Sequence, residues 1–193
     1  MSTISRRALV TRLALSSVAV GGVAVTVLAL GLTGTGQAQN GRGAAAGHPI
    51  ATIQTNKGTI RVRLYPEEAP KTVENFVKLA KRGFYNGLAW HRVIPGFVAQ
   101  GGDPKGDGTG GPGYTIKNET NKKLRHNRGA VAMANAGRDT AGSQFYIVIG
   151  KAAPHLDNGD YTIFGQVIQG QDVAEKLVVG DKMTRVTITE AKK

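Results

Sequence analysis

The chain has 193 residues, a formal net charge of +12 and no cysteine. This length suits one domain with an extension at one end, and the missing thiols exclude structural disulfides, thiolate metal sites, cysteine nucleophiles and lipid attachment to an N-terminal cysteine. The charge is uneven, because four arginines and no acid precede His48, which leaves +8 for the rest of the chain. A basic domain can attract nucleic acid or anionic lipid. Here the Lys and Arg residues are scattered among acids, so we interpret the charge as a solvated surface.

The N-terminal segment joins a basic start to an uncharged apolar stretch. Residues 1–12 carry three arginines and no acid, and no charge follows between Leu13 and Leu32. This order is typical of an export signal, and Gly-Gln-Ala at 36–38 resembles a cleavage site. The stretch is also long enough to cross a bilayer. Residues 1–38 are therefore expected to be a signal peptide or an N-terminal membrane anchor, and a buried globular helix is the less favoured alternative.

Both forms of export place the domain outside the cytoplasm, because the arginines stay inside. The expected location is the periplasm, the cell surface or the medium, or a membrane to which the segment anchors the chain. Arg6-Arg7 also resembles the pair of a twin-arginine signal. Residues 39–49 are predicted to be a flexible linker, and residues 50–193 the folded domain.

The domain opens with a pattern that predicts a β-hairpin over 50–65, in which apolar and polar residues alternate around a turn at 56–58. A helix is predicted to begin near Pro70 and to end near Gly83. Further strands are expected at 96–100, 130–134, 144–149, 162–167 and 184–189, and a short helix is expected at 171–178. Many short strands with two helices predict a mainly β fold, a closed antiparallel β-barrel capped by two α-helices.

Three stretches are more specific than ordinary barrel strands. They are WHRVIPGFVAQGGD at 90–103, MANAG at 133–137 followed by GSQFY at 142–146, and LD at 156–157 with YTIFG at 161–165. In order and spacing they resemble the cyclophilin family of peptidyl-prolyl cis/trans isomerases, and the resemblance runs from about residue 51 to residue 190. It implies a cyclophilin-like barrel, Pro-containing polypeptides as partners and a monomeric state, and no cofactor is expected. No metal is expected either, because four His and no Cys offer no metal-ligand spacing, and the scattered charge argues against nucleic acid.

The resemblance also implies roles for individual residues. Arg92 matches the catalytic arginine, whose guanidinium is always charged and offers a rigid fork of donors. Gln100 matches the residue that holds this arginine and the substrate backbone, and Phe97 belongs to the same catalytic set. The positions that match the substrate-binding groove are Val98, Ala134, Asn135, Ala136, Gln144, Tyr146, His155, Leu156 and Tyr161.

Four of these residues depart from the commonest family pattern. Val98 stands where many members have Met, Tyr146 where Phe is common, His155 where Trp is frequent, and Tyr161 where His is frequent. Catalysis is expected to survive these changes, because the Arg, Phe, Gln and Asn set is intact. Since His155 replaces the Trp, cyclosporin, the family's macrocyclic inhibitor, is expected to bind weakly.

Other features have alternative interpretations. His91 could serve acid/base chemistry, but the reaction moves no proton, so we favour a packed side chain. The glycine-rich stretch 101–113 could cradle phosphate, but it lacks the GKS or GKT ending and is expected to be a surface loop. The basic run 122–128 is expected to be a solvated loop, with docking to an acidic partner or a membrane as the alternative. For the whole protein, a Pro-binding scaffold and a surface adhesion or nucleic-acid-binding protein remain the competing functions.

Overall fold

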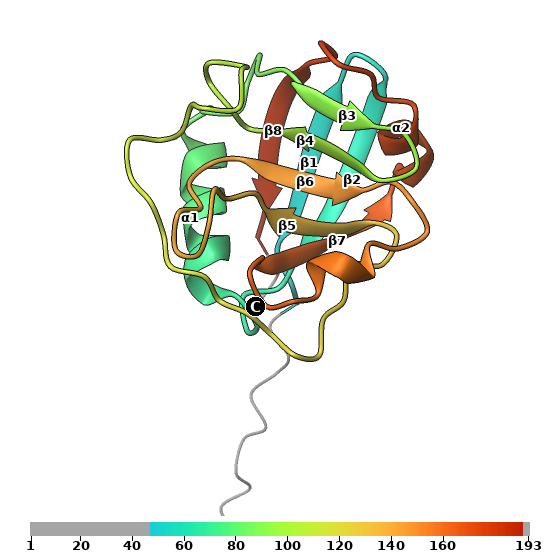
Figure 1. Ribbon diagram of the computed structural model, residues 1–193. Coiled ribbons are helices and arrows are strands. Elements are labelled where there is room, and N and C mark those ends of the chain that lie inside the picture. The colour runs from blue at the N-terminus through green and yellow to red at the C-terminus, as the bar shows by residue number, and fades with distance from the viewer. Residues whose placement is uncertain (1–46, 191–193) are drawn as a thin grey trace, which may run out of the picture. The chain divides into compact units, whose positions relative to one another are not determined.

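The computed structural model describes residues 47–190, in which eight strands form one curled sheet with two α-helices and a 3-10 helix (Figure 1). The strands are β1 (Ile50–Thr55), β2 (Gly58–Leu64), β3 (Arg92–Ile94), β4 (Val98–Gly101), β5 (Ala130–Met133), β6 (Phe145–Val148), β7 (Ile163–Gln169) and β8 (Met183–Thr189). The helices are α1 (Pro70–Lys81), η1 (Pro154–Leu156) and α2 (Gln171–Glu175). The expected export segment lies outside the described residues. Within 47–190, no helix has the length and hydropathy needed to cross a bilayer.

The sheet runs in the order β3-β4-β6-β5-β7-β2-β1-β8, and its paired neighbours are antiparallel. The sequence predicted a closed barrel. Among residues 47–190 the edge strands β3 and β8 are not paired with each other as strands, so the sheet is a curled, open one. The two edges still meet at one end, through the isolated bridge Ala89↔Lys182 and the hydrogen bond from the Trp90 amide to the Asp181 carbonyl.

Most predicted elements are confirmed, with small shifts at their ends. The hairpin turns at residues 56–57, and α1 begins at Pro70, whose missing N–H is not needed in the first helical turn. The second helix is shorter than the predicted 171–178, because it ends at Glu175. Strand β3 and the 3-10 helix η1 were not predicted, since three residues are too few to show a period.

Two neighbouring strands of the sheet, β5 and β6, are covered on both faces. All residues of β5 and β6 are buried, which alternation of apolar and polar residues cannot produce. On β6, Phe145 and Ile147 belong to the main core, whereas Tyr146 and Val148 belong to a second apolar cluster on the opposite face. This second cluster includes Val98 from β4 and is bordered by Phe97 and Tyr161 from loops and by Leu156 from η1.

The main core centres on aromatic rings that α1 and the strands contribute. Phe76 of α1 packs against Tyr85, Phe145 and Phe164 at ring-centroid distances of 5.1–5.4 Å. The buried Tyr85 hydroxyl donates to the carbonyl of Ser143, just before β6. The core therefore fixes where β6 begins, and with it the residues that β6 presents on its other face.

Candidate active site

The site is built on one row of residues that crosses the sheet. Arg92 on β3 lies opposite Gln100 on β4, Gln100 lies opposite Tyr146 on β6, and Tyr146 lies opposite Ala132 on β5. Residues directly opposite each other in antiparallel strands project from the same face of the sheet. Strand pairing alone therefore brings a cation, a carboxamide and an aromatic ring together on the outer face, although they are up to 54 positions apart in the chain.

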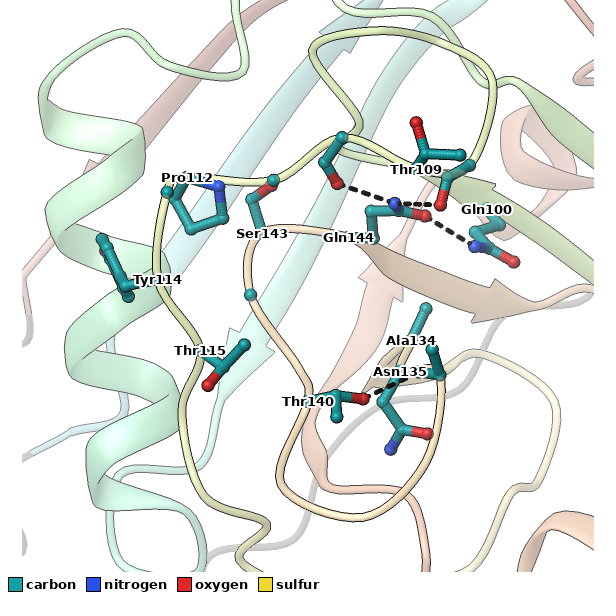
Figure 2. A pocket seen from close by; sticks show the side chains of 16 residues that line it. Gln100, Thr109, Pro112, Tyr114, Thr115, Ala134, Asn135, Thr140, Ser143 and Gln144 are labelled. Atoms are coloured by element: carbon teal, nitrogen blue, oxygen red, sulfur yellow. Dashed lines mark hydrogen bonds between the residues drawn. The ribbon is translucent and has the colours of Figure 1, made fainter.

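Arg92 is exposed and is held by a chain of carboxamides. Its Nη1 donates to Gln100 Oε1 at 3.3 Å, and Gln100 Nε2 donates to Gln144 Oε1 at 3.0 Å. Gln144 Nε2 donates in turn to the carbonyls of Gly108 and Gly110 at 2.8 and 2.9 Å (Figure 2). Each bond fixes the orientation of the next amide, so the glycine-rich loop determines how Gln100 presents its oxygen to Arg92.

The glycine-rich loop is itself organised by one buried carboxylate. Asp103 accepts hydrogen bonds from the amides of Lys105 and Gly108 at 2.8 and 2.5 Å. Burial opposes ionisation of Asp103, but hydrogen bonds from several loop amides outweigh it and hold the pKa of this carboxyl below its usual value. A side chain at Gly110 would collide with Asp103, since an added Cβ would lie 1.9 Å from Oδ1. The loop's amides therefore bind an internal carboxylate, a physical reason against the phosphate cradle.

An apolar pocket of about 260 Å³ opens beside Arg92. Nine of the twelve residues predicted for the site line it: Arg92, Phe97, Val98, Gln100, Ala134, Asn135, Tyr146, Leu156 and Tyr161. Val98 and Tyr146 are almost fully buried beneath the pocket, and its other apolar walls come from the loops before β4 and after η1. The pocket is thus a small apolar hollow with one cation and two carboxamides at its edge.

A larger groove of about 640 Å³ adjoins the apolar pocket and shares Gln100, Ala134 and Asn135 with it (Figure 2). Two more predicted residues, Ala136 and Gln144, line this adjoining groove. Its far wall is the glycine-rich loop, including Thr109, Pro112 and Tyr114. Sequence reasoning expected a surface loop here and did not name these residues; the run of glycines was the signal that the backbone approaches a neighbour closely.

The remaining predicted residue, His155, lies at the rim. Its exposed ring packs on Phe97 with the centroids 5.2 Å apart and the planes inclined by 31°. His91 is half-buried, and both its ring nitrogens are shielded from solvent with no hydrogen-bond partner among residues 47–190. Such a ring has no acid/base contact with the pocket residues, in agreement with a packed side chain.

His126 is the residue that the sequence interpretation placed wrongly. The run 122–128 was expected to be a solvated loop, yet His126 is only 2% exposed. Its Nδ1 lies 2.7 Å from Asp157 Oδ1, and its Nε2 lies 2.9 Å from the Tyr146 hydroxyl. The hydroxyl of Tyr146 gives this imidazole a polar partner in the interior, which the family's common Phe cannot do.

The charge states in this cluster follow from burial and pairing. Burial lowers the pKa of His126 against the opposing effect of Asp157, so the imidazole is neutral at pH 7. Burial opposes ionisation of Asp157, but hydrogen bonds from His126 outweigh it and lower the pKa of that carboxyl. An ionised carboxylate only accepts, so Nδ1 carries the proton and Nε2 accepts from Tyr146. Burial raises the pKa of Tyr146, which keeps its hydroxyl a donor.

Within residues 47–190, no group of three His, Asp or Glu side chains could hold a metal ion. The chemistry that the site itself offers is a fixed guanidinium beside an apolar hollow. Such a site can bind a small apolar ring and donate a hydrogen bond to an atom at its edge.

The sequence of this chain resembles one family of known proteins. The family model described as "Cyclophilin type peptidyl-prolyl cis-trans isomerase/CLD" matches residues 50–193. A Bacillus subtilis protein named peptidyl-prolyl cis-trans isomerase B is 57% identical over 130 residues, which cover 67% of this chain and 90% of that protein. A Helicobacter pylori peptidyl-prolyl cis-trans isomerase is 51% identical over 144 residues, which cover 73% and 87%.

Among solved structures, a Cryptosporidium parvum cyclophilin type peptidyl-prolyl cis-trans isomerase, crystallised in the presence of the dipeptide Ala-Pro, superposes with a TM-score of 0.68. It is 32% identical to this chain, and the match covers 73% of this chain and 99% of that one.

Proposed function

Because the chain belongs to the cyclophilin family and is a peptidyl-prolyl cis/trans isomerase, we propose that it isomerises X-Pro bonds in exported proteins and assists their folding. In this proposal Arg92 donates a hydrogen bond to the prolyl nitrogen of the twisted amide. The observation that carries the proposal is the position of Arg92, held by Gln100 at the edge of the apolar pocket.

The reaction needs stabilisation of a geometry rather than a covalent intermediate. Amide resonance gives the X-Pro bond a rotational barrier of roughly 18–20 kcal/mol, so uncatalysed exchange takes tens to hundreds of seconds. An acceleration of about 10⁵-fold requires roughly 7 kcal/mol of differential stabilisation. In the twisted amide the nitrogen lone pair is localised. A fixed donor at that nitrogen therefore favours the twisted state over both planar states.

The apolar pocket suits the proline ring. Its walls are the side chains of Phe97, Val98, Tyr146 and Leu156, and its volume of about 260 Å³ exceeds what one five-membered ring fills. A ring seated in this pocket is fixed, so rotation must occur on the side of the preceding residue. The preceding residues are proposed to run along Ala134, Asn135 and Ala136, where small side chains leave the adjoining groove open.

The decisive experiment follows cis/trans exchange of a Pro-containing peptide catalysed by the full chain and by Arg92→Ala. Removing the donor proposed for the prolyl nitrogen is expected to lower kcat/KM by about 100-fold or more. Arg185→Ala is the matched control, because it removes an exposed strand arginine on β8 and should leave the activity within about twofold. Full activity in a folded Arg92→Ala variant would show that this arginine is not the catalytic donor.

The competing role is a scaffold that binds Pro-containing segments, with turnover incidental. The two roles separate in the same experiment. If Arg92→Ala loses turnover but complements the folding of exported proteins as the original chain does, binding is the physiological role. If complementation is lost together with turnover, catalysis is.

Export is proposed from the sequence of residues 1–38 alone. Fractionation of cells that express the chain with a C-terminal tag tests it. Recovery from the periplasm, the medium or the membrane supports export, and the mass of the product separates a cleaved signal from a retained anchor. Recovery of the intact chain from the cytosol contradicts it.

A further inference from the structure

Three walls of the apolar pocket, the side chains of Tyr146, Tyr161 and Leu156, are connected to the buried imidazole of His126, which lies behind them. His126 is absent from the pocket lining. Its Nε2 accepts from the hydroxyl of Tyr146, and its ring meets the Tyr161 ring edge-on at 6.3 Å. The two tyrosine rings also meet each other edge-on at 6.1 Å. A residue outside the pocket therefore contacts both of its tyrosines.

The third wall is reached through Asp157, which follows Leu156 directly. The Asp157 carboxylate accepts from the backbone amide of His126 at 2.9 Å and from its Nδ1 at 2.7 Å. These two bonds tie the end of η1 to the strand side of the pocket. Arg125 approaches the same carboxylate only at 4.0 Å and from an exposed position, so His126 is the closer anchor.

A cavity of about 340 Å³ lies on the other side of these walls, where it shares Leu156 and Tyr161 with the apolar pocket. His126 and Asp157 line this rear cavity. The hydrogen-bonded pair lies behind the shared walls, so we expect these walls to shift toward the rear cavity when the pair is lost. The pocket's shape thus depends on groups that never touch its contents.

We infer that His126 is a positioning residue for the isomerase, which acts through the Tyr146 hydroxyl and the Asp157 carboxylate to hold three walls of the apolar pocket in place. This inference rests on the proposed role of that pocket as the site for the proline ring. The pocket holds the ring in the planar and in the twisted state alike, so loosening its walls weakens the two states equally. The loss is therefore expected in KM, with kcat nearly unchanged.

The test uses two His126 variants that differ in which nitrogen they replace. His126→Asn can replace Nδ1 toward Asp157 but has no atom at the Nε2 position, whereas His126→Gln reaches the Nε2 position and can still bond the hydroxyl of Tyr146. His126→Asn is expected to raise KM about tenfold with kcat within about threefold, and His126→Gln is expected to restore KM to within about threefold. Circular dichroism and the unfolding midpoint confirm that both variants are folded.

A double-mutant cycle with Tyr146→Phe asks whether His126 works through the hydroxyl. If it does, His126→Asn costs no more than about twofold once Tyr146 is already Phe, because the contact is gone from both sides. Nitrogen-15 spectra of the imidazole give an independent readout, since Nε2 should be unprotonated and should shift in Tyr146→Phe.

Each result decides the matter. Unchanged KM in a folded His126→Asn, or losses that multiply in the double variant, overturn the inference. Arg92→Ala, measured alongside, separates this from failure of the proposed function: its kcat falls whether or not His126 positions the walls. If Arg92→Ala keeps full kcat, it is the catalytic assignment that fails, and the KM comparison still decides the role of His126.

Discussion

Gln100 lies directly opposite Arg92 across strands β4 and β3, and its side-chain oxygen accepts a hydrogen bond from the guanidinium at 3.3 Å. The Nε2 of the same carboxamide donates to Gln144, so its oxygen is held as an acceptor and its nitrogen as a donor. A second pair, Arg61 and Gln169, has the same atoms at the same 3.3 Å, at exposed positions of β2 and β7 that do not line the apolar pocket. The protein thus contains its own comparison for this interaction.

Gln100→Ala is expected to lower kcat/KM by about tenfold, because the guanidinium loses its acceptor and samples other rotamers. Peptide exchange measured with the full chain checks this. Gln169→Ala removes the acceptor of the matched Arg61 pair and should leave activity within about twofold. Equal effects of the two substitutions would mean that the Arg92 contact has no special role.

Asp103→Ala is expected to destabilise the fold by roughly 1.5–3 kcal/mol, since the amides of Lys105 and Gly108 lose a charged acceptor. The loop then releases Gln144, so KM should rise most for peptides with several residues before the proline. Denaturant unfolding and a series of peptide lengths measure the two effects. Asp107→Ala is the control, because this exposed loop carboxylate accepts from the amide and the hydroxyl of its near neighbour Thr109; a similar loss there would contradict the role of Asp103.

The free energy of unfolding is expected to fall as the pH drops below about 6.5, the ordinary pKa of histidine. The pKa of His126 is lower in the folded chain than in the unfolded chain. Between these two pKa values the unfolded chain binds a proton and the folded chain does not, so the free energy of unfolding rises with pH. One such proton changes stability by at most about 1.4 kcal/mol per pH unit. Asp157 acts at lower pH: its lowered pKa gives stability that is present above 3.8 and is lost on further acidification.

Denaturant unfolding between pH 7.5 and 5 measures this slope. The slope should disappear in His126→Gln and persist in His155→Gln, which removes an exposed imidazole. A slope of the same size in all three chains would assign it to groups other than His126.

His155→Trp is expected to tighten cyclosporin binding by about tenfold, because the larger indole extends the apolar rim that the imidazole now forms on Phe97. Titration of the inhibitor against peptide exchange provides the measurement. Isomerase activity without inhibitor should stay within about threefold, since His155 does not line the apolar pocket. If the affinity does not rise, His155 is not the cause of the expected weak cyclosporin binding, and Val98 or Tyr161 is the next candidate.

The sequence predicted the elements that are long enough to show a period, and it predicted the site through three motifs. The hairpin and α1 span enough residues to show alternation or helical spacing. The motifs carried eleven of the twelve proposed site residues, and His155 directly precedes the third motif. Strand β3 has three residues and no period of its own, so it becomes visible only through its pairing with β4.

Two features were beyond sequence reasoning for a different reason. His126 sits in a basic run whose composition indicates solvent, and only tertiary contacts with Asp157 and Tyr146 bury it. Whether the sheet closes is likewise set by how far it curls. Among the described residues the two edges meet only beside the strands β3 and β8, through the bridge Ala89↔Lys182 and the backbone hydrogen bonds around it.

The adjacency of Phe145 and Tyr146 on β6 has a consequence for motion. One residue belongs to the core and the next to the pocket, so a slip of the strand by one position would exchange them and destroy both. We therefore expect the amides of β6 to exchange with solvent only when the whole domain unfolds. Any opening that admits or releases a polypeptide is expected in the parts of the lining that are not strands: the turn at 95–97, residues 134–135 and the segment 153–161.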